Sequence, residues 1–591
     1  MRPLHQCLLG TDLARLRVIA RFWDVELTAS RQRDVAAQLA EAMATPEATV
    51  AAWDALPDEQ RRALEALLAA GGKMPLRVFA RGWGQIRTMG PGRLEREQPW
   101  QEPFSPAEGL WYRGFISRVF EQGPEGAYEV VFVPPELRAH LPVPPTPPPT
   151  IALEPASEPA VVRSTGDALL PLLDDACTLL AYLQNERLRP GPNGGWPTRH
   201  EVRLVQRLLD PDPARLIFLR HLAQHVGWLR VTDAGRLRPD PEPVAAWLQS
   251  PSGQQQRVLA EAWQDDPTWN DLFHVPTLHP EDTGAWRNDP LLARKAVLCH
   301  LEAVYRGPVA CTEPRRSERC VPDTWYGLDD FAAAVKRVDP DFQRPDGDYT
   351  TWYIRDAATG TYLSGFESWE AIEGALIRYL ITGPLAWLGL TDLGASTPDG
   401  PPTAFRLTLA GAAFLGLAEL PPEPEPAPLV LRSDFTLLVP PARRYERFQL
   451  ARVADWVSSP LAGGTEGSFV YRLTPTSLER ARRQGIPVTR VLEFLGEVTN
   501  APVPRFAEAA LTRWEARGAE VRLERAVLLR FSSEELMAQV TSSPYTRHLI
   551  HEQVGPTAAL VRERDWLRLI SALGEMGLLP DVIGLEGVDA D

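Results

Sequence analysis

Arginine is the residue type best able to perform recognition chemistry in this chain, because it carries nearly all of the positive charge. Lysine occurs only at Lys73, Lys295 and Lys336, among 62 basic residues. A guanidinium group donates paired hydrogen bonds to phosphate or carboxylate oxygens, so clustered arginines are candidate contacts to a nucleic-acid backbone. The candidates are Arg31, Arg33, Arg87, Arg93, Arg230, Arg236, Arg443, Arg444, Arg480, Arg482 and Arg483.

Two simpler explanations of these arginines stay open. A high arginine content follows from codon usage in a GC-rich genome. Basic side chains near Glu446 and Glu479 also form ordinary ion pairs on a solvated helix face. The glycine-rich segment at residues 79–97, which carries Arg87 and Arg93, has neither phosphate-loop nor dinucleotide spacing, so a surface turn is the favoured interpretation.

Residues for catalysis are harder to find. A nucleotide-driven motor needs a glycine-rich loop that ends in Lys-Ser or Lys-Thr. None of the three lysines has that context, and no Ser-His-Asp, His-Glu-x-x-His or calcium-loop signature occurs. The paired carboxylates Asp265-Asp266 and Asp329-Asp330 have no recognisable nuclease spacing. We therefore expect a protein without catalytic residues and without a cofactor.

A metal site is considered at one cysteine cluster. Cys299, His300, Cys311 and Cys320 lie close in sequence, but Cys311 and Cys320 are nine residues apart. Zinc ligands usually come in pairs two to four residues apart. We favour buried or incidental thiols and predict no metal ligand.

Length and composition indicate several globular domains. The chain has 591 residues, 44% hydrophobic and 24% charged, with a net charge of −15. An acidic chain is a poor non-specific phosphate binder, so any DNA contact must use a local basic face. Five scattered cysteines fit a reducing compartment, and neither a signal segment nor a membrane span is expected. We expect a cytoplasmic protein with no membrane partner.

Proline-rich segments divide the chain. The expected domains are a helical, winged-helix-like domain at 1–140, a linker at 141–164, a winged-helix-like domain at 165–250, a second helical, winged-helix-like domain at 251–420, a linker at 421–428 and a C-terminal α+β domain at 429–591. Helices at residues 12–23 and 31–43, joined by an extended link, resemble the SAP motif of several DNA-binding proteins, although a plain helical hairpin fits equally well.

Winged-helix units are expected from the order of elements. Helices at 200–209 and 213–225 precede a strand, turn and strand at 227–239, which places Arg230 and Arg236 beside a wing. A similar order follows at 328–417, with strands expected at 349–354, 385–393 and 405–409.

The C-terminal domain has the highest density of helix start and stop signals in the chain. Thr474-Pro475 is a helix start and Gly485 a helix stop, which predicts a helix over 475–484 after a short strand at 469–473. Residues 429–580 resemble the N-terminal domain of XPB-type helicases. The resemblance is carried by residues 431–440, 471–478, 485–487, 491–495 and 504–514.

That resemblance implies engagement of DNA and of a helicase partner of the XPB type, and it transfers no catalytic residue. The helicase motor itself is absent from the sequence. We therefore expect a mainly α, multidomain α+β chain of bacterial origin. Its expected role is that of a non-enzymatic, helicase-associated DNA-binding or adaptor protein in repair, transcription or defence. The alternatives are a winged-helix transcription regulator, a metal-dependent nuclease that partners a helicase, and a pure protein-interaction scaffold.

Overall fold

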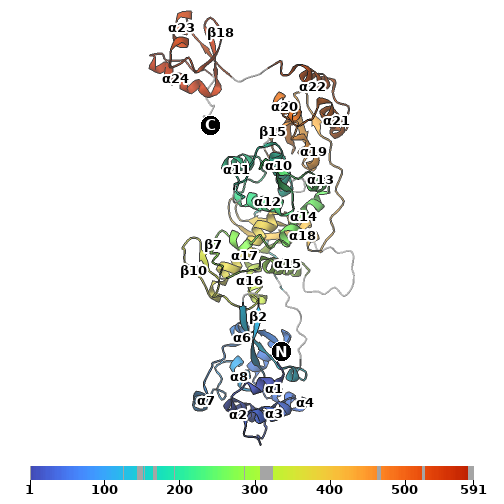
Figure 1. Cartoon of the computed structure of the whole chain (residues 1–591), viewed down its shortest axis with the longest axis vertical. Coiled ribbons are helices and arrows are strands. Elements are labelled where there is room, and N and C mark those ends of the chain that lie inside the picture. The colour runs from blue at the N-terminus through green and yellow to red at the C-terminus, as the bar shows by residue number, and fades with distance from the viewer. Residues whose placement is uncertain are drawn as a thin grey trace. The chain divides into compact units, whose positions relative to one another are not determined.

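The computed structural model describes residues 2–123, 126–142, 151, 153–163, 170–191, 194–284, 286–306, 324–461, 467–521 and 526–583. Its contacts separate two units, Met1–Leu473 with Val498–Asn500, and Thr474–Glu497 with Ala501–Asp591. Figure 1 follows the chain through both units by colour, and each unit is described below by itself. Among the described residues, no helix combines the length and apolarity that crossing a bilayer requires.

The first part of the chain packs helices around a small antiparallel sheet with strand order β1-β3-β2. Leu16, Leu39, Leu64 and Phe115 are fully buried in one shared core, which ties the early helices to the segment before β2. The elements are α1 (Leu4–Leu9), α2 (Leu13–Phe22), α3 (Gln32–Met43), α4 (Pro46–Asp54), α5 (Asp58–Ala69), β1 (Lys73–Pro75), α6 (Leu76–Trp83), α7 (Pro91–Glu97), α8 (Pro106–Tyr112), β2 (Ser117–Gly123), β3 (Gly126–Phe132) and α9 (Pro135–Arg138).

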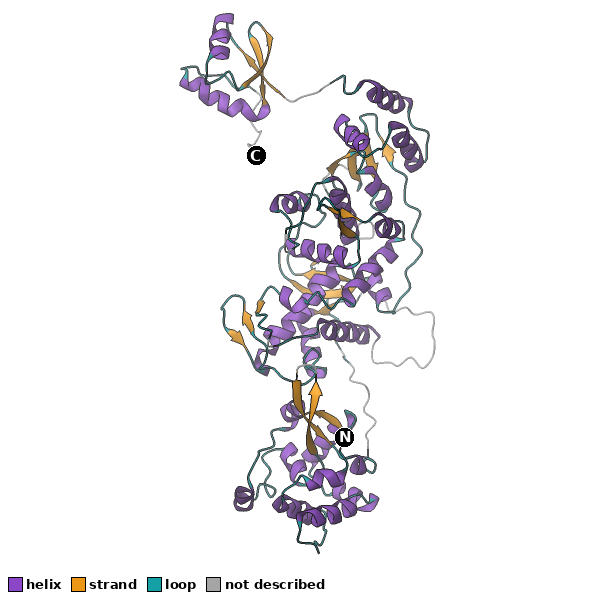
Figure 2. Cartoon of the chain, viewed as in Figure 1, coloured by secondary structure: helices purple, strands orange, loops and turns teal. Residues whose placement is uncertain are grey.

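The middle of the first unit is mostly helical, and its strands form small separate sheets among the helices (Figure 2). The elements are β4 (Val161–Arg163), α10 (Pro171–Asn185), α11 (Thr198–Val205), α12 (Pro213–His225), β5 (Leu229–Val231), β6 (Leu237–Pro239), α13 (Pro241–Leu248), α14 (Ser252–Gln264), β7 (Leu278–Pro280), α15 (Pro290–Arg306), β8 (Tyr326–Gly327), α16 (Leu328–Val338), β9 (Ile354–Asp356), β10 (Tyr362–Leu363), α17 (Ala375–Leu380), β11 (Thr391–Ala395), β12 (Pro402–Leu407) and α18 (Leu409–Phe414). The sheet β4-β11-β12-β8 brings residues before α10 beside strands near residue 400.

The last part of the first unit is a four-stranded antiparallel sheet with order β13-β14-β16-β15. Its elements are β13 (Val430–Leu431), β14 (Thr436–Val439), α19 (Arg444–Leu450), β15 (Asp455–Ser458) and β16 (Phe469–Arg472). Helix α19 packs on α10 through buried polar groups. The Arg444 Nε donates to Asp174 Oδ1 at 3.0 Å, and the Arg447 Nε lies 3.3 Å from Cys177 Sγ.

The second unit contains helices and a three-stranded antiparallel sheet with order β17-β19-β18. Val540, Val561, Leu569 and Leu573 are buried in its core, which joins the sheet to the last helix. The chain after Leu473 forms α20 (Pro475–Arg483), α21 (Val488–Thr499), α22 (Arg505–Arg517), β17 (Ala526–Arg530), α23 (Glu534–Ser542), β18 (Ile550–Gly555), β19 (Ala558–Arg562) and α24 (Trp566–Glu575).

The predicted fold class, a mainly α chain with small β elements, is confirmed. The predicted strand, turn and strand at 227–239 is the β5–β6 hairpin. The predicted SAP-like helices are α2 and α3, although the SAP and winged-helix assignments themselves stay predictions.

Two strand predictions were wrong. Residues 381–385 form a π-helical turn around Pro384, and the strand begins only at Thr391. A π-helical turn changes the hydrogen-bond pattern, which accommodates a proline without an N–H group. Residues 349–353 are not a strand, because the Asp348 carboxylate accepts hydrogen bonds from the Thr350 N–H and hydroxyl and closes a local turn.

Candidate nucleic-acid interface

Helix α20 is fixed at both ends by local signals. The Thr474 hydroxyl accepts from the Ser477 N–H at 3.0 Å, and the Ser477 hydroxyl accepts from the Thr474 N–H at 3.0 Å. This reciprocal capping box satisfies two helix-end donors, and Pro475 fits the first turn. Gly485 follows the helix with a φ of 78°, a conformation that glycine adopts without strain. The sequence therefore determines where α20 begins and ends.

Two arginines of α20 project into solvent and share one carboxylate. The side chains of Arg482 and Arg483 are 69% and 76% exposed. The Glu479 carboxylate accepts from Arg482 at 2.8 and 3.0 Å and from Arg483 at 3.1 Å. These hydrogen bonds, first that of Arg482, hold the pKa of Glu479 below its usual value. Arg480 is half-buried on the same helix.

The exposed face of α20 therefore carries more positive than negative charge. One carboxylate offsets at most one of the two guanidinium groups, and exposed ion pairs of this kind exchange readily with other anions. All three arginines lie in the last turn, where cations also favour the helix macrodipole. The arrangement can bind a phosphate while it stabilises the helix end.

The arginines at the start of α19 do not form such a surface. The Arg443 side chain is 25% exposed and donates to Glu446 and to the Pro426 and Ala427 carbonyls. Arg444 is 2% exposed and paired with the fully buried Asp174. A guanidinium enclosed in this way cannot reach a phosphate, so the prediction of Arg444 as a nucleic-acid contact is corrected to a structural role.

The arginines of the glycine-rich segment are engaged with carboxylates. Arg87 donates to both oxygens of Glu108, at 2.8 and 2.7 Å. Glu108 is fully buried, so this bidentate pair anchors the segment to α8. Arg93 forms an exposed pair with Glu97 at 2.7 Å one turn along α7, and this hydrogen bond lowers the pKa of Glu97. Arg93 remains exposed to solvent, whereas Arg87 has a structural partner.

The other predicted contacts lie elsewhere in the first unit. Arg31 precedes the first turn of α3 and Arg33 lies within it, and both are exposed. Arg230 is exposed on β5, and the half-buried Arg236 precedes β6 across the same hairpin. Within the first unit the candidates therefore occupy α3, the segment around α7, the β5–β6 hairpin and α19, on separate elements.

The cysteine cluster considered as a metal site, at which we predicted no metal, is only partly described. Cys299 is exposed on α15, and His300 pairs with Asp339 at 3.2 Å. Cys311 and Cys320 lie outside the described residues.

Among the described residues, His221, His225 and Asp266 form a group that could hold a metal ion, and the sequence analysis did not identify it. The spacing of the two histidines was a readable signal, since residues four apart share a helix face. Asp266 was considered only as part of an acidic pair. Its position beside the histidines depends on how α12 and α14 pack.

Comparison with known proteins identifies one region. Residues 429–554 match the family described as helicase conserved C-terminal domain. This match indicates a helicase-related protein. No curated protein matches the chain.

The matched region begins one residue before β13, includes α20 and ends within β18. It therefore covers most of the region for which we predicted a helicase relationship. The matching family is a helicase C-terminal domain, however, so the match does not support the finer prediction of an XPB-type N-terminal domain.

Proposed function

We propose that this protein is a non-catalytic, helicase-associated adaptor that binds DNA through a local basic surface on α20. The observation that carries the proposal is the match of residues 429–554 to a helicase C-terminal domain family. A protein related to helicases acts on or beside nucleic acid, and α20 lies inside the matched region.

The charge distribution supports a local contact. The net charge of −15 opposes uniform attraction to DNA, so affinity has to come from a face where cations exceed anions. Arg482 and Arg483 provide such a face, with Glu479 as their shared partner. When a DNA phosphate binds there, an arginine gives up its weak, solvated ion pair with Glu479 and donates charge-assisted hydrogen bonds to the phosphate instead.

The adaptor role is supported by the sequence itself. A chain without a Lys-Ser or Lys-Thr phosphate loop lacks the group that cradles nucleotide phosphates in a conventional helicase motor. The protein then contributes DNA contact while an XPB-type helicase or another DNA-processing enzyme supplies the motor, in repair, transcription or defence.

The full chain, titrated onto labelled single-stranded, duplex and forked DNA at several salt concentrations, tests this proposal. We expect binding that weakens linearly on a logarithmic plot against salt, together with no DNA-stimulated ATP hydrolysis by the pure protein. Absence of binding even at low salt would contradict DNA contact. DNA-stimulated ATP hydrolysis over many turnovers by the pure protein would contradict the adaptor role.

A further inference from the structure

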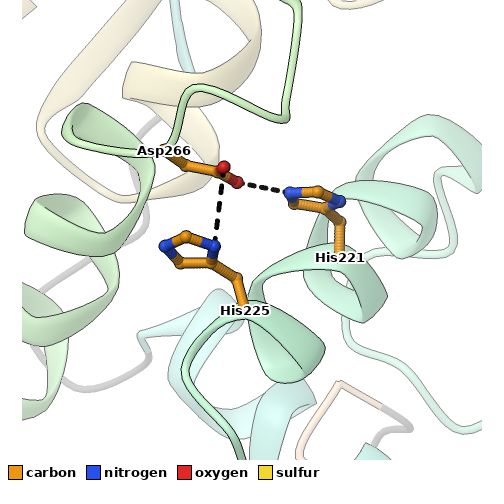
Figure 3. A group of neighbouring side chains, drawn as sticks. All are labelled: His221, His225 and Asp266. Atoms are coloured by element: carbon orange, nitrogen blue, oxygen red, sulfur yellow. Dashed lines mark hydrogen bonds and ion pairs between the residues drawn. The ribbon is translucent and has the colours of Figure 1, made fainter.

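Three potential metal ligands converge in the first unit. His221 and His225 lie four residues apart on α12, so both side chains leave the same helix face. Asp266 follows α14. Figure 3 shows both imidazole rings directed toward the Asp266 carboxylate. One ligand atom from each residue lies within 4.8 Å of the others.

We propose that His221, His225 and Asp266 form a binding site for a divalent transition-metal ion of the zinc class. Two imidazole nitrogens and one carboxylate oxygen are a typical ligand set for zinc and for non-haem iron. Magnesium and calcium prefer oxygen ligands, so the two histidines select against them.

The distances need only a small adjustment. His221 Nε2 lies 2.5 Å from Asp266 Oδ2, and His225 Nδ1 lies 3.5 Å from Asp266 Oδ1. Ligand atoms bound to one zinc at about 2.0–2.1 Å in a tetrahedron are about 3.3 Å apart. The ion takes the place of the proton between His221 and Asp266, and a rotation of these side chains widens that contact. His225 Nδ1 faces the other carboxylate oxygen, Oδ1, so a side-chain rotation is also needed for His225 and Oδ2 to bind the same ion.

The carboxylate is oriented by a second set of contacts. Asp266 is fully buried, and its Oδ1 accepts from the Thr268 N–H at 2.7 Å and from the Thr268 hydroxyl at 2.6 Å. Such partners orient metal-binding carboxylates and raise metal affinity. Oδ2 makes its hydrogen bond to His221 and is the oxygen that the ion would share.

The backbone around Asp266 is held independently of any metal. The fully buried Arg294 donates to the carbonyls of Trp263 and Asp266 at 2.5 and 2.6 Å, and to Asp271 Oδ2 at 2.6 Å. The Trp269 ring also lies 4.9 Å from the His221 ring. A site supported by such packing keeps its ligands close to their binding positions.

The site is open on its histidine side. The His221 and His225 side chains are 26% and 34% exposed, whereas Asp266 is inaccessible. An ion can therefore enter from solvent and retain water at its remaining position, the pattern of zinc sites with three protein ligands.

The ion would also stabilise the base of the β5–β6 hairpin. His225 is the last residue of α12, Gly227 reverses the chain with a φ of 74°, and β5 begins at Leu229. A metal that ties His225 to the segment after α14 holds the end of α12 from which the hairpin departs.

The test uses the full chain, freed of metal with a chelator, and titrates it with Zn²⁺ and separately with Co²⁺. His225→Gln is the main variant, because His225 is partly exposed and its replacement leaves the core intact. His279→Gln is the matched control, since His279 is exposed on β7. Calorimetry with Zn²⁺ and the visible absorption of Co²⁺ report binding, and the melting temperature without metal reports folding.

We expect the parent chain and His279→Gln to bind one more equivalent than His225→Gln, with a rise in melting temperature on Zn²⁺ addition that His225→Gln lacks. Thr268→Val, which removes only the hydroxyl contact to Asp266, should weaken the metal by about 10- to 100-fold. Equal binding by the parent chain and His225→Gln, or no binding by either, would overturn the proposal.

Discussion

Arg444 Nε donates to Asp174 Oδ1 at 3.0 Å, and neither side chain has more than 2% of its surface exposed. The two residues are 270 positions apart. Arg447, one turn further along α19, donates to the Asp174 carbonyl at 2.5 Å. These contacts join α10 to the start of the region that matches helicase C-terminal domains, so a buried charge pair holds two distant segments together.

Asp174→Asn should strongly destabilise the first unit, because it leaves Arg444 buried without its charge partner. Loss of one member of a buried ion pair costs roughly 3–5 kcal/mol of unfolding free energy. Urea unfolding followed by tryptophan fluorescence measures the change. Arg257→Gln is the control, since the Arg257–Glu261 pair is exposed and its loss should cost less than about 1 kcal/mol. Equal effects of the two variants would show that the buried pair has no special weight.

Cys177 should resist thiol reagents in the native protein. Burial raises the pKa of its thiol, and the side chain lies between α10 and α19 beside Arg447. Cys299 is exposed and should react first. Alkylation at mildly alkaline pH, followed by peptide mass spectrometry, gives the two rates. In Asp174→Asn the protection of Cys177 should fall. Rapid labelling of Cys177 in the parent chain would contradict the α10–α19 packing.

Thr474→Ala should destabilise α20 by about 1 kcal/mol, because it removes the acceptor for the Ser477 N–H. Hydrogen exchange of the first-turn amides of α20 measures the effect locally. Thr474→Ser should restore most of the protection, since serine also caps helices well. If alanine and serine behave alike, the capping box does not determine the start of α20.

His200 should make stability depend on pH. Burial first, and then the nearby Arg199 and Arg203 charges, lower its pKa in the folded protein. Its Nδ1 lies 2.8 Å from the Tyr182 hydroxyl, and its buried Nε2 has no hydrogen-bond partner among the residues that the structure describes. Protonation would therefore place an unpaired charge in the interior.

The direction in which stability changes with pH follows from proton uptake by the unfolded chain. The unfolded chain binds a proton at His200 near the ordinary pKa of about 6.5, whereas the folded chain resists it until lower pH. This contribution to stability is complete above about pH 6.5 and is lost as the pH falls toward the folded-state pKa. His200→Asn should show a smaller loss of melting temperature between about pH 7.5 and about pH 5.5 than the parent chain. If His200→Asn and the parent chain lose the same amount of melting temperature over this pH range, His200 is not the source of the pH dependence.

Features set by neighbouring residues could be predicted from the sequence, whereas features set by distant residues could not. The limits of α20 were predictable, because Thr474, Pro475 and Gly485 act within one segment. The burial of Arg444 was not, since its partner Asp174 lies on a helix that only tertiary packing brings near. An arginine-rich segment looks the same in sequence whether it faces solvent or the interior.

The candidate metal site shows the same limit. The spacing of His221 and His225 places both on one face of a predictable helix. The third ligand comes from the segment after α14, more than one element away, and its approach depends on how α12 packs on α14. Two ligands were therefore within reach of sequence analysis, and the third was not.

The most direct test of the DNA-contact claim compares two double variants. The first, on α20, combines Arg482→Gln and Arg483→Gln. The second, on α22, combines Arg513→Gln and Arg517→Gln. Arg513 and Arg517 share Glu520 on the matched region much as the α20 pair shares Glu479, and both of their side chains are 65% exposed. The charge change is therefore identical in the two variants.

Salt-dependent binding of the full-length variants to forked DNA is the measurement. The slope of log affinity against log salt is negative, and each lost phosphate contact reduces its magnitude by about 0.9 on duplex DNA. We predict that the α20 variant binds more weakly and that the magnitude of its slope is smaller than that of the parent chain by about 1–2. The α22 variant should match the parent chain in both affinity and slope. Equal slopes for the α20 variant and the parent chain would contradict DNA contact by α20.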